Sequence, residues 1–189
     1  MLGKDHPATV TSRSNLSVAL IEAKQFEVAL PLAQGVYADW TAMLGEGHPK
    51  TMVAMGNLAY LLEDLGRLDE AESLYRKAIE IRRRASGGKD PETWAPMNNL
   101  AMLLQKRGDL AQAEVQYREL IALCESALPP DHIYTAIFRS NFGECLGLIG
   151  NRDEARKVLE ASVVVLEKKV GPDHTRTIKA RERLATLGR

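Results

Sequence analysis

The chain has 189 residues, of which 45% are hydrophobic, and its 25 Lys+Arg balance 25 Asp+Glu. This hydrophobic content can bury a core, which excludes a disordered chain, and the balanced charge provides no field that would attract nucleic acid or an anionic membrane. Since no apolar run approaches the roughly 18 residues of a membrane span and no secretory signal is present, we expect a cytoplasmic protein that binds neither nucleic acid nor membrane.

A repeat with a period of 42 residues organises the sequence. One aligned column holds Thr9, Thr51, Thr93, Thr135 and Thr177. Another holds Asn15, Asn57, Asn99 and Asn141 and becomes Arg183 in the last copy. We therefore predict one domain over residues 1–189, with repeats at 2–43, 44–85, 86–127 and 128–169 and a C-terminal helix within 170–189.

Each repeat opens with a short polar phrase such as "LGKDHPATV". The phrase contains His6, His48, His132 or His174, and Asp90 fills the same column in the third repeat. Zinc needs nitrogen ligands at about 2.0–2.1 Å, whereas one histidine per repeat separates neighbours by more than the roughly 8–10 Å of one helix contact. We interpret the histidine, or the preceding Asp5, Asp131 or Asp173, as a helix cap, and the column threonine as bonding nearby backbone. We expect no metal and no cofactor.

Two helices follow each phrase. In the second repeat Leu58, Leu61, Leu62 and Leu65 lie on one face of a first helix that ends at Gly66. The next stretch, "LDEAESLYRKAIEIRRRA", predicts a second helix with a buried apolar stripe. Small residues let the helix axes approach closely at Ala59, Ala101 and Gly143 of the first helices and at Ala29, Ala71, Ala113 and Ala155 of the second helices. The pattern thus predicts four helix pairs and a lone helix near residues 175–187.

The first repeat departs from this pattern. Lys24 replaces the turn glycine, and Pro31 falls inside the expected second helix. Because proline removes a backbone hydrogen bond and clashes with the preceding turn, we predict a kink or a late start in that helix. Met1 lies directly before a repeat boundary, and we expect the chain to be a fragment of a larger protein.

No enzyme motif emerges from the rest of the chain. Cys124 and Cys145 have no metal-type spacing, and we expect both to be small buried side chains. The stretch "SGGKD" at 86–90 is rich in glycine but joins two helices, where a phosphate-binding loop would follow a strand, so it predicts a turn between repeats.

The repeated segments "NLAYLLEDLGRLDEAESLYRKAIEI" and "NLAMLLQKRGDLAQAEVQYRELIAL" resemble the tetratricopeptide repeat. Its small-residue, glycine, alanine and tyrosine positions are matched by Ala59, Gly66, Ala71, Tyr75 and Ala78. The 42-residue period and the "LGxDHPxT" phrase resemble the kinesin-light-chain subfamily in particular. The resemblance implies an all-α fold, a right-handed superhelical solenoid of four antiparallel helix pairs with a C-terminal capping helix, and a protein-interaction scaffold that is not an enzyme.

In this family the first helices line the concave side of the solenoid. One face of them holds Thr11, Ser14, Gly56, Val53, Tyr60, Asn98, Met102, Ser140 and Glu144, with Asn99 one position beyond. We predict a peptide-binding groove of Val53, Tyr60, Asn98, Asn99, Met102, Ser140 and Glu144. Tyr60 and Met102 are the expected anchors, although inter-helix packing is an alternative role for both. Asn98 with Asn99 is the expected ligand-contacting pair, although the asparagine column could instead bond between repeats.

Three functions follow in order of preference. The first is binding of an extended or helical segment of a partner protein in this groove. The second is self-association, in which uncapped ends of the solenoid stack on another copy and make a homo-oligomer. The third, an enzyme that uses the histidines, conflicts with their spacing. An acidic-tail receptor is disfavoured because Met55 and Met97 of the central repeats occupy the place of Arg13, Arg139 and Arg181.

Overall fold

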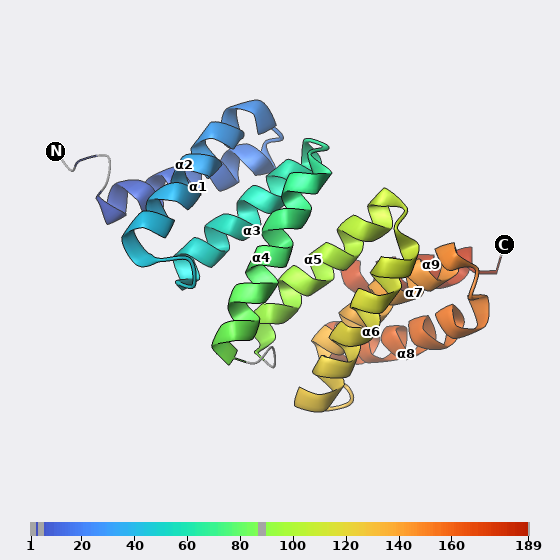
Figure 1. The fold of residues 1–189 in the computed structure, drawn as a ribbon. Helices are drawn as coiled ribbons and strands as arrows, with labels where there is room; N and C mark the ends of the chain where they lie inside the picture. The colour runs from blue at the N-terminus through green and yellow to red at the C-terminus, as the bar shows by residue number, and fades with distance from the viewer. Residues whose placement is uncertain (1–2, 4–5, 87–89, 189) are drawn as a thin grey trace. The chain divides into compact units, whose positions relative to one another are not determined.

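A computed structural model describes residue 3 and residues 6–86 and 90–188, and within them it contains nine helices and no strand. The helices are α1 (Pro7–Glu22), α2 (Phe26–Leu44), α3 (Pro49–Asp64), α4 (Leu68–Ser86), α5 (Pro91–Arg107), α6 (Leu110–Ala127), α7 (Ile133–Ile149), α8 (Arg152–Val170) and α9 (Thr175–Thr186) (Figure 1). None of these described helices is long and apolar enough to cross a membrane. The predicted all-α fold of four helix pairs and a terminal helix is confirmed.

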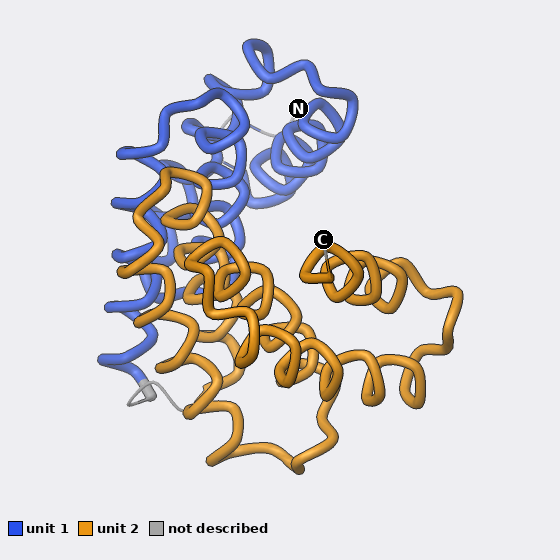
Figure 2. Tube along the Cα trace, turned by 90° about the vertical axis from the view of Figure 1, so that its right-hand side faces the viewer, with its two compact units in different colours: residues 1–88 blue, residues 89–189 orange. Residues whose placement is uncertain are grey.

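The chain divides into two compact units (Figure 2). Unit 1, residues 1–88, contains α1–α4, and unit 2, residues 89–189, contains α5–α9. In each unit consecutive helices pack against one another, from α1 on α2 to α3 on α4, and from α5 on α6 to α8 on α9. First helices also contact each other, as α5 contacts α7 and α7 contacts α9. The predicted turn at 86–90 and the candidate cap Asp5 fall largely outside the described residues.

Left-handed residues end the first helices. Gly66, Gly108 and Gly150 have φ of 75°, 86° and 92°, a conformation that glycine adopts without steric cost. Lys24 takes the same place in the first repeat with φ of 57°. The Gln25 backbone N–H still donates to the Leu20 carbonyl at 2.9 Å, as the residue after each glycine does in its own repeat. The first turn therefore keeps the shape of the others despite its lysine.

Pro31 lies inside α2 and does not delay the start of that helix. Helix α2 begins at Phe26, which is 42 residues before Leu68, the first residue of α4. The predicted late start is therefore wrong, because the apolar contacts of Ala29, Ala33 and Val36, all buried, hold the segment in the common register. A kink at Pro31 stays a prediction.

Small residues set the distance between the two helices of a pair. Ala59 and Ala101 on first helices, and Ala71 and Ala113 on second helices, are completely buried. Gly143 of α7 is the closest of these contacts, since a Cβ added to it would lie 2.5 Å from Cγ of Leu159 on α8. A side chain there would force the helices apart.

The remaining core matches the expected apolar stripes. Leu58, Leu61 and Leu62 are buried, and so are Cys124 and Cys145. Burial raises the pKa of the Cys124 thiol to about 12 and that of Cys145 to about 11, so both stay protonated at neutral pH and behave as small apolar side chains.

Two glycine substitutions test the close contact. We expect Gly143→Ala to lower the free energy of unfolding by about 1–3 kcal/mol, because Leu159 must move to admit the new methyl group. Gly56→Ala in α3 is the matched control, since nothing lies within 4 Å of its added Cβ, and we expect it to stabilise the chain by about 0.4–1 kcal/mol. Urea unfolding followed by circular dichroism measures both. Equal effects of the two substitutions would contradict the assignment of Gly143 to a close helix contact.

Candidate functional site

The four histidines are helix caps. Nδ1 of each accepts a hydrogen bond from the backbone N–H two residues later, from Ala8, Lys50, Tyr134 and Arg176, at 3.1–3.2 Å. Asp90 accepts the equivalent bond from the Glu92 N–H at 2.9 Å. The capping interpretation is confirmed, with the histidine as the N-cap residue of α1, α3, α7 and α9.

The threonine column is less uniform than predicted. The hydroxyl of Thr9 donates to the Gly3 carbonyl at 3.0 Å, and that of Thr177 to the Gly171 carbonyl at 2.8 Å. Thr51, Thr93 and Thr135 are buried, and their hydroxyls have no hydrogen-bond partner among the described residues. The predicted bond to nearby backbone is therefore present only in the two outermost of the five copies.

In unit 2 a chain of polar contacts crosses the first helices from α5 to α9. The Asn98 amide donates to the sulfur of Met102 at 3.3 Å, and the Asn141 amide donates to Oδ1 of Asn98 at 2.8 Å. The Arg183 guanidinium donates to Oδ1 of Asn141 and to Oγ of Ser140, both at 2.9 Å. Asn98, Asn141 and Ser140 are at most 9% exposed, so these bonds form below the surface.

Met102 and Glu144 are the parts of this chain that reach solvent. Met102 is 41% exposed although it is apolar, and its sulfur is held by the amide of Asn98. Glu144 forms an ion pair with Arg183 at 2.6 Å, and its side chain is 42% exposed whereas that of Arg183 is 12% exposed. The buried guanidinium thus fixes an exposed carboxylate on α7, while the buried amides fix an exposed thioether on α5.

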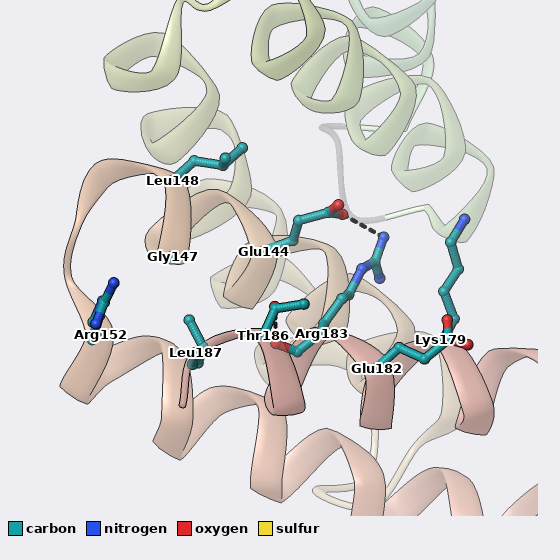
Figure 3. A pocket seen from close by; sticks show the side chains of 9 residues that line it. All are labelled: Glu144, Gly147, Leu148, Arg152, Lys179, Glu182, Arg183, Thr186 and Leu187. Atoms are coloured by element: carbon teal, nitrogen blue, oxygen red, sulfur yellow. Dashed lines mark hydrogen bonds and ion pairs between the residues drawn. The ribbon is translucent and has the colours of Figure 1, made fainter. Parts of the chain in front are cut away.

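A pocket of about 380 Å³ lies beside the Glu144–Arg183 pair between α7, α8 and α9 (Figure 3). Its lining is Glu144, Gly147, Leu148, Arg152, Lys179, Glu182, Arg183, Thr186 and Leu187. Leu148 is 58% exposed at the rim, whereas Leu187 is buried. Arg152 and Lys179 lie at opposite ends of the lining in Figure 3. The lining therefore combines apolar residues, Gly147, Leu148 and Leu187, with charged side chains of both signs.

In unit 1 a second pocket, of about 230 Å³, lies between α1, α2 and α3. Its lining is Thr11, Ser14, Trp40, Pro49, Lys50 and Val53. The Lys50 ammonium lies 4.5 Å from the centre of the Trp40 ring, a cation–π distance. Tyr60, two helical turns after Val53, is 51% exposed, and the neighbouring Asp64 carboxylate raises its phenol pKa. The predicted face of α1 and α3 is thus hollowed and partly aromatic.

The predicted groove residues fall into both units. Val53 and Tyr60 lie exposed on α3 in unit 1. In unit 2 the contacts with Asn141 and Arg183 join Asn98, Met102, Ser140 and Glu144. Asn99 is half-buried on α5 and takes no part in that chain of bonds. Asn98 and Ser140 are buried beneath this surface, where Asn98 bonds the sulfur of Met102 and Ser140 accepts a bond from Arg183.

Sequence reasoning missed the importance of Arg183. It stands in the asparagine column, and the change from amide to guanidinium was visible in the alignment of the repeats. It also missed Trp40 and Lys50, which come from outside the first-helix face that was considered.

The other arginines near this face are paired with second-helix carboxylates. Arg13 contacts Asp39 at 2.5 Å and Arg139 contacts Glu125 at 2.7 Å. Arg181 contacts Glu167 at 2.6 Å. These pairs place a carboxylate beside each cation of this face, and the disfavouring of an acidic-tail receptor stays a prediction.

Comparison with known proteins agrees with this architecture of stacked helical hairpins. The tetratricopeptide repeat family profile matches residues 20–84, 50–126 and 95–168, which together span more than half of the chain. The chain belongs to the tetratricopeptide repeat family. A search of curated protein sequences finds no match.

Solved structures share the fold. The chain is similar to the putative kinesin light chain nearly identical TPR-like repeats of Podosopora anserina, with 21% identity, a TM-score of 0.78, and coverage of 96% of this chain and 86% of that one. It is also similar to BtubC (BKLC) from P. vanneervenii, with 20% identity, a TM-score of 0.79, and coverage of 95% and 72%. The apo form of RapI matches with 13% identity and a TM-score of 0.74 over 90% of this chain and 45% of that one. The predicted resemblance to kinesin-light-chain repeats is confirmed at the level of the fold.

Exchanging a cap residue tests the role of the histidines. We expect His48→Ala to lower the free energy of unfolding by about 1 kcal/mol, because the Lys50 N–H loses its acceptor. We expect His48→Asp to retain the stability, since Asp90 makes the same bond in the third repeat. Thermal and urea unfolding measure both variants. If aspartate at this position were as destabilising as alanine, the histidine would have a role other than capping.

Proposed function

We propose that the protein is an interaction scaffold built from tetratricopeptide repeats. This general role follows from the family and from the helical-repeat fold. The binding surface is argued below from the side chains of each unit, taken one unit at a time.

We propose that the first-helix face of each unit binds an extended segment of a partner protein, with Tyr60 as the apolar anchor in unit 1 and Met102 as the anchor in unit 2. The observation that carries this proposal is the exposed position of Met102, which two buried asparagines support from below. An exposed apolar side chain held in one position loses little entropy when a ligand packs on it, which favours affinity. The protein thereby acts as a non-enzymatic scaffold.

The charges of unit 2 define the complementary segment. The Glu144–Arg183 pair satisfies itself, which leaves Arg152 and Lys179 at the two ends of the adjacent pocket and Glu182 also in its lining. Leu148 and Gly147 form the apolar part of its lining between them. A segment with one medium-sized apolar side chain and nearby acidic residues would satisfy both features. In unit 1 the pocket beside Val53 also combines apolar side chains, among them Trp40, with one cation, Lys50.

Substitution of the two anchors tests the proposal with peptides selected on the intact protein from a displayed random library. We expect Met102→Ala and Tyr60→Ala each to weaken the binding of such peptides by about tenfold or more, because exposed anchors contribute most of the affinity of a small interface. Val115→Ala on α6 is the matched control, since Val115 is 62% exposed but lies on a second helix. Fluorescence polarisation with the selected peptides measures the affinities. Peptides whose affinity is unchanged in both anchor variants would rule out this surface.

A second candidate function is self-association through the N-terminal repeat. Leu16 of α1 is 54% exposed, whereas Leu58, Leu100 and Phe142, which occupy the same column, are at most 6% exposed. Helix α2 packs against α3, which carries Leu58, and α6 packs against α7, which carries Phe142, whereas α1 is the first helix of unit 1. Exposure of a leucine in a column whose members on α3, α5 and α7 are buried favours stacking of a second copy on this end.

Leu16→Glu tests this second candidate. If copies stack through α1, the mass of the wild-type protein in light scattering should rise with concentration. Leu16→Glu should abolish this rise, because burying a carboxylate against an apolar face has a large desolvation cost. Val28→Glu, at a position 59% exposed on α2, serves as the control. A wild-type protein that remains monomeric up to about 1 mM would exclude an assembly of ordinary affinity.

A further inference from the structure

A pocket of about 430 Å³ lies within unit 2, where α6 and α8 both pack on α7. Its apolar lining consists of Phe142 of α7, which is buried, and of half-buried or exposed side chains of the second helices: Ile121 and Ala122 of α6, and Val158 and Ala161 of α8. None of these residues belongs to the first-helix face or to the two pockets described above. The pocket is therefore a separate surface, and what it binds does not depend on the function proposed above.

Ion pairs bridge the helices around this pocket. The Arg118 guanidinium of α6 donates to both carboxylate oxygens of Glu154 on α8, at 2.8 Å and 2.9 Å, and lies 5.0 Å from the centre of the Phe142 ring. Arg118 and Glu154 are the first lining residues of their helices, so this pair joins α6 to α8 at one end of the pocket. Arg139 of α7 pairs with Glu125 of α6 at 2.7 Å. Both arginines of the lining are thus neutralised.

Lys157 of α8 is the cation of the lining that stays available to a ligand. It is exposed, and it forms no ion pair with any other residue that the structure describes. Since both carboxylates of the lining are already held by arginines, one positive charge remains uncompensated beside the apolar surface. A pocket of this kind selects a ligand that combines an apolar body with one negative charge.

The corresponding place in unit 1 is filled by the chain's own side chains. Ile121 and Ala161 stand two 42-residue repeats after Tyr37 of α2 and Lys77 of α4. Tyr37 packs against a buried cluster that includes Met55 of α3, and the Lys77 ammonium lies 6.0 Å from the centre of the Tyr37 ring. Isoleucine and alanine are too short to make this contact between the second helices. The space that an aromatic ring takes in unit 1 is therefore open in unit 2.

We propose that the pocket between α6, α7 and α8 binds a small aryl carboxylate, with its ring against Ile121 and Val158 and its carboxylate on Lys157. The ring takes the kind of place that Tyr37 occupies in unit 1. A carboxylate carries one negative charge at neutral pH, which one lysine balances, whereas a phosphate monoester carries nearly two. A compact molecule fits beside the ion pair that joins α6 to α8, whereas an extended peptide that followed the groove between these helices would have to break it.

Two compounds of equal shape, phenylpropionate and its neutral amide, test the proposal on the full chain. Chemical-shift titration of the backbone amides by NMR gives both the affinity and the place of binding. Lys157→Gln removes the unpaired charge, and Arg156→Gln is its control, because Arg156 is exposed on the same helix but lies outside the pocket. The double substitution Ile121→Tyr with Ala161→Lys gives the pocket the side chains of unit 1. Its control is Val164→Tyr, at a position of α8 that is 65% exposed and outside the lining.

We expect phenylpropionate to bind with a Kd of about 1 mM, about fivefold more tightly than its amide, and to shift the amide signals of Ile121, Phe142 and Val158. Lys157→Gln should remove the preference for the carboxylate. The double substitution should weaken the binding of both compounds about tenfold or more, because its side chains occupy the place of the ring. Both control variants should bind as the wild-type protein does.

Equal affinities of the two compounds for the wild-type protein, or a preference that survives Lys157→Gln, would overturn the proposal. So would binding that is unchanged in the double variant, or no binding of phenylpropionate at about 10 mM. If the double variant does not fold, Ala161→Lys alone makes the same test at an exposed position. A capped tyrosine peptide that bound this pocket more tightly than phenylpropionate would also overturn the proposal, because the occupant would then be a protein segment.

Discussion

The close approach of the two helices in each pair is the contact on which the other features of the structure depend. Ala59 and Ala101 are fully buried at this contact, and at Gly143 an added methyl group would collide with Leu159. Within the two units the larger side chains of Tyr75, Trp94 and Tyr117 are almost completely buried as well. The close contact also fixes the rotation of each first helix, and with it the residues that reach solvent on the opposite face. The position of Met102 at the surface is thus a consequence of Ala101 at the contact.

Much of this fold could be predicted from the sequence because its signals are local and repeated. The cap, the turn glycine and the apolar stripe each act within a few residues, and agreement across the copies removes the ambiguity of any single one. The start of α2 could not be predicted in this way, because packing of Ala29 and Val36 outweighs the local effect of Pro31. The left-handed Lys24 is a related case, in which the fold imposes a backbone conformation that the residue type does not favour.

The candidate site was predictable only in part. The first-helix face follows from helical periodicity, and Tyr60 and Met102 do lie exposed on it. Which polar side chains bond one another depends on rotamers and on neighbours in the next repeat, as in the contact of Asn98 with Asn141, which are 43 residues apart. Helical periodicity alone predicts that Ser140 and Glu144 are equally exposed to a ligand, since both lie on the same face. Arg183 separates them, because it reaches both from α9 and leaves only the carboxylate in contact with solvent.

The capping histidines have a consequence for how such a chain can change in length. One 42-residue segment contains the side chain that caps the first helix, the residues of its first turn and the glycine that follows its end. In the second repeat these are His48, Pro49 and Gly66. A segment duplicated in frame would bring its own helix start, its own turn and its own small residue at the contact within the helix pair. Growth by whole segments is therefore far less disruptive than insertion of a few residues, which would shift every later side chain out of its column.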